Sequence, residues 1–422
     1  MSDAAAAEDA SHDPGKQARI DQGIPIIGAL DGFRAAAIFA VVILHLFGAV
    51  DITQNHWVRT ALRAMASSVD ILFILSGFVV FLPTVARGGD FGSRTAYAIR
   101  RAARLLPAYW LCLAIVALFL ALWPGPSAPA NPGLLDYGGH VLAIHDWVHL
   151  FDAGFPLGLG IDGALWTLTV ELTFYAILPL IASAWFRRPL LGLAISALIT
   201  IGWKLAAADI GPLLAFVGVN PSLGRLLEIR YAALGEFPAF AFCFGLGMTS
   251  AWAYVRLRQT QPKEVLERWA GRIQPLALVG LVICAYLFGR GIVGHNNVAT
   301  LLAAREKIVL NLALDIAYAA IMLATALAVR RRQMPFALPR ARALGDISYG
   351  IYLIHLPTFY FLRAEFSDDG LWDALGGHLF LALIGVPIAI GFGWLSARLL
   401  ETPVRQWARR YGRRTAIAGA TR

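Results

Sequence analysis

Charged residues are unusually scarce in this chain of 422 residues. Asp, Glu, Lys and Arg make up 15% of it, against about 25% in soluble domains. Hydrophobic residues make up 58%, against roughly 45–50% in soluble domains, and the mean hydropathy is +0.63. A soluble globule could not bury that much apolar surface. The composition therefore excludes a soluble domain, a disordered chain and a coiled coil.

Cysteine and several common motifs are scarce or missing as well. The three cysteines, Cys112, Cys243 and Cys284, all lie in apolar runs, which argues against a disulfide framework. The first 25 residues lack the apolar core of a signal peptide. The sequence has no phosphate-binding loop, GxSxG elbow, dinucleotide fingerprint or HExxH pair in its proper context. These absences exclude the commonest soluble enzyme classes.

Long apolar runs indicate an all-α, polytopic membrane protein. A helix needs about 20 apolar residues to cross a bilayer, and we expect ten such spans, with 210–219 as an interfacial segment. The expected spans are 28–50, 66–84, 104–123, 164–185, 190–208, 232–255, 275–289, 308–329, 344–362 and 378–398.

The distribution of basic residues predicts the orientation of these spans. If the N-terminus is cytoplasmic, cytoplasmic segments hold 26 Lys and Arg residues and external loops hold 9. Such an excess is typical of cytoplasmic loops, so it explains the net charge of +9 without a nucleic-acid partner. We expect both termini in the cytoplasm. The expected segments are a disordered cytoplasmic tail over 1–27, a ten-helix membrane domain over 28–405 and a basic cytoplasmic tail over 406–422.

The first expected span carries Asp31, Arg34 and His45. Arg34 and His45 are 11 residues apart, which places them on one helix face and about 16 Å apart along the axis. Charged groups inside a bilayer are costly and usually functional. Arg34 is therefore expected near the cytoplasmic side and His45 in the outer half of the membrane.

Other spans add to two polar layers. The helix directions place Asp70, Glu171 and His355 in the outer half, with Ser76 near the middle, and Arg100, Arg101 and Arg104 at the cytoplasmic edge. Glu236, Asn311 and Asp315 are further polar groups inside the membrane. Each group also has a simpler explanation: a histidine that bonds a neighbouring helix, arginines that only anchor the topology, a local Asp31–Arg34 pair, or Asp70 as a helix cap. Their joint occurrence on several helices favours a shared function.

A long external loop contains further histidines. His140, His145 and His149 lie there with Asp136, Asp146 and Asp152. The spacing of His145 and His149 could suit a metal, but no third ligand is fixed by spacing, and we expect no metal. We expect the loop to line an acceptor entrance or to form a solvated cover.

Six segments in register carry a family resemblance. They are LDGFRAAAIFAVVILH (30–45), VDILFILSGF (69–78), RRAARLLPAYW (100–110), LWTLTVELTFYAILPL (165–180), LGDISYGIYLIHLP (344–357) and LETPVR (400–405). Together they resemble the bacterial membrane acyltransferase-3 family, O-acyltransferases that modify surface sugars and some secondary metabolites. The resemblance covers about residues 28–405. Thr167 and Thr169 stand where serine is common, and Ile354 where an aromatic residue is common.

The resemblance implies a cytoplasmic acyl-CoA donor as co-substrate, no permanently bound cofactor, and an extracytoplasmic hydroxyl acceptor. It implies that His45 is catalytic and that Arg34, Arg100, Arg101 and Arg104 handle the donor. Asp31, Asp70, Ser76, Tyr349 and His355 are expected to support the site. Some family members carry an additional extracytoplasmic esterase-like domain. We expect none here, so that the acceptor reaches the membrane core or a separate protein relays the acyl group.

The residues fit this chemistry independently of the resemblance. Guanidinium groups bind phosphates well, and histidine is the side chain that exchanges protons near neutrality. Glu171 is expected to be catalytic by orienting the His45 imidazole. Direct transfer and a transient acyl-histidine both stay open.

We therefore expect an enzyme of the bacterial cytoplasmic membrane, embedded in the lipid bilayer. It would transfer an acyl group, acetyl in the first instance, from acyl-CoA to a hydroxyl of an extracytoplasmic glycan or lipid-linked sugar. The alternatives are a transporter or flippase for a polysaccharide precursor, although no paired repeat is evident, and a structural subunit of an export complex. Loss of the thioester from acyl-CoA would separate the enzyme from both.

Overall fold

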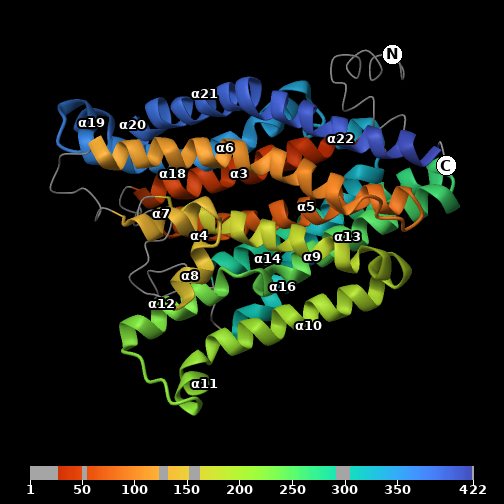
Figure 1. Ribbon diagram of the computed structural model, residues 1–422, viewed down its shortest axis with the longest axis horizontal. Coiled ribbons are helices and arrows are strands. Elements are labelled where there is room, and N and C mark those ends of the chain that lie inside the picture. The colour runs from red at the N-terminus through yellow and green to blue at the C-terminus, as the bar shows by residue number, and fades with distance from the viewer. Residues whose placement is uncertain (1–26, 50–54, 123–131, 152–161, 291–304, 421–422) are drawn as a thin grey trace.

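The computed structural model describes residues 27–49, 55–122, 132–151, 162–290 and 305–420 (Figure 1). Within these ranges the chain forms helices and their connections, and no strand. The expected all-α fold is confirmed. Of the expected N-terminal tail, all but residue 27 lies outside the described residues.

The long helices are α3 (Ala29–Ala49), α5 (Ser68–Ala86), α6 (Arg94–Leu122), α9 (Trp166–Arg187), α10 (Pro189–Ala208), α13 (Phe237–Thr260), α14 (Lys263–Arg290), α16 (Arg305–Leu327), α18 (Pro339–Phe366), α21 (Val386–Ser396) and α22 (Thr402–Ala420). The short helices are α4 (His56–Met65), α7 (Leu134–Val141), α8 (His145–Phe151), α11 (Ile210–Phe216), α12 (Leu223–Leu234), α17 (Arg330–Gln333), α19 (Gly370–Leu375) and α20 (Gly377–Phe380). A 3₁₀ turn η2 (Gly163–Leu165) and two π-helical turns, η3 (Leu381–Gly385) and η4 (Ala397–Glu401), complete the described elements.

Several helices begin where a side chain or a proline favours a start. The Asn55 side chain accepts hydrogen bonds from the backbone N–H groups of Trp57 and Val58, at 2.9 and 3.3 Å, and so caps α4. The Asp369 carboxylate caps α19 by accepting from Leu371 N at 2.7 Å. Prolines stand in the first turn of α10, α13 and α18, where a missing N–H costs nothing.

Nine helical segments within the described residues are long and apolar enough to cross a membrane. They correspond to nine of the ten expected spans. The remaining expected span, 344–362, lies in α18, which has 28 residues. This helix is long enough to cross a membrane but is not apolar enough, because tyrosines, His355 and Ser348 interrupt its apolar residues. Its middle is buried among other helices instead. The interfacial segment expected over 210–219 contains the short helix α11, and the expected basic tail continues α22 as far as Ala420.

The long helices lie side by side along the long axis of the molecule (Figure 1). The short helices α7, α8, α12, α19 and α20 gather at one end, and α22 lies at the other. α5 packs along α13, α3 along α18, and α14 along α16. This arrangement places α3, α5, α6, α9 and α18 around a common interior.

The contact of α5 with α13 depends on two glycines. A Cβ atom on Gly247 would come within 2.1 Å of the Ile74 carbonyl oxygen, and one on Gly77 within 2.4 Å of the Phe244 carbonyl oxygen. Small residues of this kind let helix backbones approach closely in membranes. The two helices can therefore pack this tightly only with glycine at both positions.

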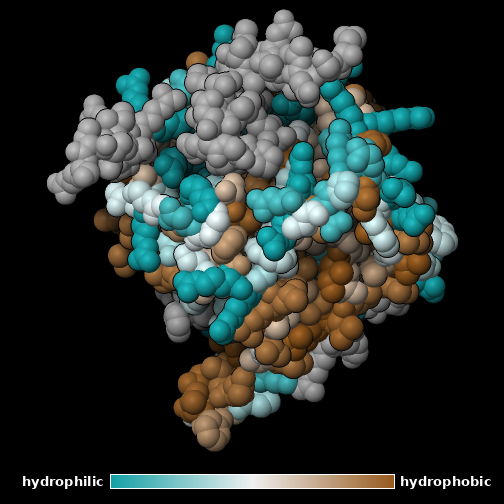
Figure 2. Space-filling view, turned by 90° about the vertical axis from the view of Figure 1, so that its right-hand side faces the viewer, coloured by the Kyte–Doolittle hydropathy of each residue, from teal (hydrophilic) through white to brown (hydrophobic). Residues whose placement is uncertain are grey.

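Apolar side chains on the outer helices face away from the bundle. On α10 and α14, Leu198 is 69% exposed and Leu276 is 71% exposed, as expected for lipid-facing helices. Figure 2 looks onto the end of the molecule near α22; hydrophilic residues cover its upper and central part, and hydrophobic residues lie along its lower part. The chain is thus a multi-pass membrane protein, and the cytoplasmic position of both termini stays a prediction.

Candidate active site

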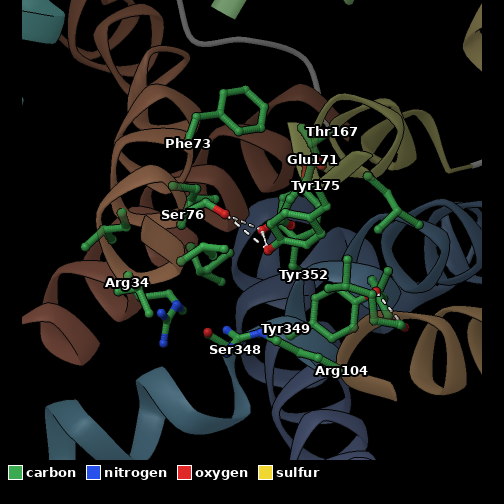
Figure 3. Close-up of a pocket in the computed structure, with 18 of the residues that line it drawn as sticks. Arg34, Phe73, Ser76, Arg104, Thr167, Glu171, Tyr175, Ser348, Tyr349 and Tyr352 are labelled. Atoms are coloured by element: carbon green, nitrogen blue, oxygen red, sulfur yellow. Dashed lines mark hydrogen bonds between the residues drawn. The ribbon is translucent and has the colours of Figure 1, made fainter. Parts of the chain in front are cut away.

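A cavity that is partly open to the outside lies between five helices. Side chains of α3, α5, α6, α9 and α18 line it, and its empty space, including the part open to the outside, is about 840 Å³. The polar residues of its lining are Arg34, Ser76, Arg101, Arg104, Thr167, Glu171, Tyr175, Ser348, Tyr349 and Tyr352. Arg34 and Arg104 lie at one end, and Thr167 and Phe73 at the other (Figure 3). Segments distant in the sequence therefore line one space that has arginines at one end.

The guanidinium groups of Arg34 and Arg104 lie at one end of the cavity (Figure 3), and a third arginine, Arg101, also lines it. Arg34 Nη1 donates to Asp31 Oδ1 at 3.2 Å, so Asp31 positions this arginine from outside the lining. Arg101 lies 5.6 Å from the ring centre of Tyr175, and its buried Nε has no hydrogen-bond partner among the described residues. Arg100 is half-buried but is not part of the lining. The structure thus brings together three of the four predicted donor-binding arginines.

Glu171 belongs to the same cavity. Its Oε1 accepts a hydrogen bond from Ser76 Oγ at 2.7 Å and a short one from the Tyr175 hydroxyl (Figure 3). Tyr175 lies one turn after Glu171 on α9, so the helix itself presents the two groups together. The structure therefore groups Glu171 with Ser76 and the arginines.

The predicted catalytic histidine is held by another histidine. His45 Nδ1 lies 2.7 Å from His355 Nε2, and the two rings stack with their centres 5.0 Å apart. His45 does not line the cavity that contains Glu171. The structure thus pairs His45 with His355, and Glu171 with Ser76 and Tyr175, while the catalytic role expected of Glu171 stays a prediction.

The partner of His355 determines how the protons are arranged. His355 Nδ1 lies 2.7 Å from the backbone carbonyl oxygen of Tyr352, and a carbonyl only accepts hydrogen bonds, so this nitrogen carries a proton. In a neutral His355 the Nε2 atom is then an acceptor, and His45 Nδ1–H donates to it. The Nε2 atom of a neutral His45 is left with its lone pair. The hydrogen-bond chain from Tyr352 through His355 thus leaves His45 ready to accept a proton.

Tyr352 connects this histidine pair to the cavity. Its side chain lines the cavity, and its hydroxyl accepts from Thr167 Oγ1 at 2.8 Å and donates to the Ala164 carbonyl at 2.9 Å. The histidine pair therefore adjoins the end of the cavity that carries Thr167. Tyr349, one turn earlier on α18, also lines the cavity and donates to the Leu105 carbonyl at 3.0 Å.

Asp70 lies elsewhere. It is buried on α5, and its Oδ2 accepts from Asn311 Nδ2 of α16 at 3.2 Å. Asn311 in turn accepts a hydrogen bond from the Lys204 ammonium group. Asp70 therefore forms part of a separate polar network, away from the residues that line the cavity.

The histidines of the loop that is predicted to be external are buried. His140 and His145 are fully buried and stack with their ring centres 4.5 Å apart, so these two side chains face the interior and not solvent. Burial lowers the pKa of His145 to about 3 and raises the pKa of Asp146 to about 7. His149 and Asp136 also belong to these helices, whereas Asp152 lies outside the described residues. These helices therefore hold a neutral His145 imidazole and an Asp146 carboxyl group that gains a proton readily.

The sequence alone did not reveal several of these residues. Tyr175 and Tyr352 have no separate signal in the sequence, because tyrosines are common at membrane interfaces. Lys204 falls within the expected span 190–208 and is 4% exposed inside the bundle. A lysine within an apolar span was the available signal for this network.

The fold and the cavity together define a multi-pass membrane protein with a buried, arginine-rich site. The family model described as "Acyltransferase domain" matches residues 27–398. The chain belongs to this acyltransferase-3 family, which confirms the predicted resemblance.

Three relatives are similar along most of the chain. The peptidoglycan O-acetyltransferase OatA of Listeria monocytogenes is 25% identical over 90% of this chain and 56% of its own length. Nodulation protein 10 of Rhizobium leguminosarum is 25% identical over 86% of this chain and 91% of its own length. The putative peptidoglycan O-acetyltransferase YrhL of Bacillus subtilis is 26% identical over 93% of this chain and 57% of its own length. The chain thus spans little more than half of OatA and YrhL. No solved structure matches.

Proposed function

We propose that this protein is an O-acyltransferase of the bacterial inner membrane. It transfers an acetyl group from cytoplasmic acetyl-CoA to a hydroxyl of an extracytoplasmic glycan or lipid-linked sugar. The observation that carries the proposal is the hydrogen-bond chain of Tyr352, His355 and His45, which leaves His45 Nε2 unprotonated beside an arginine-lined cavity. Two relatives named as peptidoglycan O-acetyltransferases support the acetyl group and the glycan acceptor.

The arginine end of the cavity supports a CoA donor. CoA carries several phosphate groups, and guanidinium forks are suited to bind them. Arg34, Arg101 and Arg104 come from two different helices, and the buried Nε of Arg101 has a free N–H. The proposal places the phosphates at this end and the thin pantetheine arm along the cavity, so that the thioester approaches the Thr167 end.

The histidine pair supports proton removal from the acceptor. The acceptor oxygen forms a bond to the thioester carbonyl carbon while His45 Nε2 takes its proton. The carbon–sulfur bond breaks, and the leaving sulfur receives the proton from His45, so that CoA departs as a thiol. His355 holds the imidazole in the required tautomer, as an orienting group does in other general-base systems.

Mass spectrometry of surface glycans tests this function in cells. Glycans from the wild-type strain, a strain without the gene, and one expressing His45→Ala are compared. We expect one class of glycan to lose the mass of an acetyl group in the last two strains alike. Identical glycan masses in all three would overturn the proposal, and a loss of whole glycan chains from the surface would instead indicate a transporter.

A further inference from the structure

A second polar cluster lies inside the bundle, apart from the cavity. Asp70 of α5, Cys243 of α13 and Asp315 of α16 each offer one ligand atom, and these atoms all lie within 4.8 Å of one another. The three residues are 5%, 2% and 1% exposed. None of them lines the arginine-rich cavity. Three helices thus converge on one buried point with two carboxylates and one thiol.

One oxygen of this cluster has no partner. Asp315 Oδ1 is buried and makes no hydrogen bond to any described residue. A polar atom without a partner is expensive inside a membrane protein, where water is not available to replace the lost bond. This oxygen is therefore placed to accept a ligand that the cluster itself does not supply.

Neighbouring residues fix the direction of one ligand. Asn311 Nδ2 donates to Asp70 Oδ2 at 3.2 Å, and the Lys204 ammonium group donates to Asn311 Oδ1. Lys204 also lies 5.7 Å from the ring centre of Phe240. Such outer contacts orient the ligands of metal sites and stabilise their charge.

The charges of the cluster balance with a divalent cation. Two carboxylates and one thiolate carry three negative charges, and the Lys204 ammonium group offsets one of them. A divalent cation brings the sum to zero, which burial in a low dielectric requires. Binding would release the proton of the Cys243 thiol. A metal-free state competes with this one. In it the two carboxylates share one proton and the Cys243 thiol stays protonated, so that the net charge with Lys204 is also zero.

We propose that Asp70, Cys243 and Asp315 bind one divalent transition-metal ion that braces α5, α13 and α16. The donor set of one sulfur and two oxygens suits zinc and disfavours magnesium and calcium, which prefer oxygen ligands alone. The fourth tetrahedral position falls to a second carboxylate oxygen or a water. The ion holds the helix pair α5 and α13 beside the active-site cavity and takes no part in acyl transfer.

Metal analysis of the purified full-length chain tests the site. Wild-type protein, extracted in detergent and washed free of loose metal, should contain about one zinc ion per chain. After chelation, added Co²⁺ should give the intense near-ultraviolet absorption that signals a cobalt–thiolate bond. Cys243→Ala should lose this band, whereas Cys284→Ala, which removes another membrane cysteine, should keep it.

Further variants separate a metal from a shared proton. Asp315→Asn should lose stoichiometric zinc, and added zinc should raise the melting temperature of the chelated wild type but not of Cys243→Ala. If Asp315→Asn fails to fold, the comparison of Cys243→Ala with Cys284→Ala decides alone. The proposal would be overturned if chelated wild-type protein gave no cobalt–thiolate band after Co²⁺ is added. So would equal zinc content in wild type and Cys243→Ala.

Discussion

In the proposed mechanism, His355 acts on the reaction only through His45. Its Nε2 accepts from His45 Nδ1, and its own Nδ1 donates to a backbone carbonyl. One buried hydrogen bond contributes about 0.5–1.5 kcal/mol, and 1.36 kcal/mol corresponds to tenfold in rate. We therefore expect His355→Ala to lower kcat by roughly tenfold.

A merely structural role would have a different signature. His355→Gln retains an acceptor for His45 and should recover part of the lost kcat, while KM for acetyl-CoA stays unchanged in both variants. Steady-state kinetics on purified protein provide the readout. A parallel rise of KM in both variants, or no difference between Ala and Gln, would refute the positioning role.

The arginines of α6 provide a matched comparison at the residue scale. Arg101 and Arg104 line the cavity and Arg100 does not. If the cavity binds the phosphates of CoA, Arg101→Gln and Arg104→Gln should each weaken binding by roughly tenfold, because hydrogen bonds to charged groups contribute about 1.5–3 kcal/mol. Arg100→Gln should leave the affinity within about twofold of wild type.

Calorimetry with CoA at two salt concentrations measures this difference. The wild type and Arg100→Gln should lose affinity as salt rises, and the other two variants should respond less because they make fewer charged contacts. Equal losses in all three variants would show that the arginines serve the topology or the overall charge, and not a phosphate site.

The α5–α13 pair is the clearest prediction at the scale of elements. Gly247→Ala places a Cβ atom 2.1 Å from the Ile74 carbonyl oxygen, and such overpacking costs about 1–3 kcal/mol. We expect a lower melting temperature in detergent. Gly280→Ala on α14, where nothing lies within 4 Å, serves as the control and should melt like wild type. A Gly247→Ala protein as stable as this control would contradict the close packing.

The short helix α8 predicts opposing effects of pH on stability. The pKa of Asp146 is raised to about 7 from 3.8, so the folded state binds more protons than the unfolded state across that interval. The contribution of Asp146 to the free energy of unfolding is therefore lost as pH rises. The pKa of His145 is lowered to about 3 from 6.5, which has the reverse effect. The contribution of His145 to the free energy of unfolding therefore increases as pH rises. Between about pH 4 and 6.5 the two slopes oppose each other.

Single substitutions should separate the two dependences of stability on pH. In His145→Gln the melting temperature should fall as pH rises from 4 to 6, and in Asp146→Asn it should rise, because one group changes stability by up to about 1.36 kcal/mol per pH unit. His140 and Glu236, which neighbour this pair, are unchanged in both variants. Slopes of the same sign in both variants would contradict the burial of this pair.

Periodicity and charge predicted most of the helices but fewer of the contacts. Nine expected spans match apolar helices because length and hydropathy are local properties. The polarity of α18 arises from residues such as Tyr352 and His355, which face other helices, so hydropathy underestimates how deeply it is buried. The role of Lys204 could not be predicted for a related reason: its partner Asn311 is 107 positions away in the sequence.

At the scale of the whole molecule, the sequence placed arginines and histidines in two layers. The structure keeps Arg34 at one end of the cavity and joins His45 to His355 through contacts that span 310 positions of sequence. The partners of Glu171 could not be predicted from its expected depth in the membrane alone, because they are set by hydrogen bonds to Ser76 and Tyr175. Its catalytic role stays a prediction, as does the division between inner and outer halves of the membrane.

The central claim is that the molecule cleaves a thioester with His45 as the base. The direct measurement is the release of free CoA thiol from acetyl-CoA by purified protein supplied with a glycan acceptor, for wild type and His45→Ala. We predict steady release by the wild type and a decrease of about 10²–10⁴-fold in the variant, the usual contribution of general-base catalysis, with equal amounts of folded protein. Undiminished release by His45→Ala, or no release by the wild type, would contradict the account.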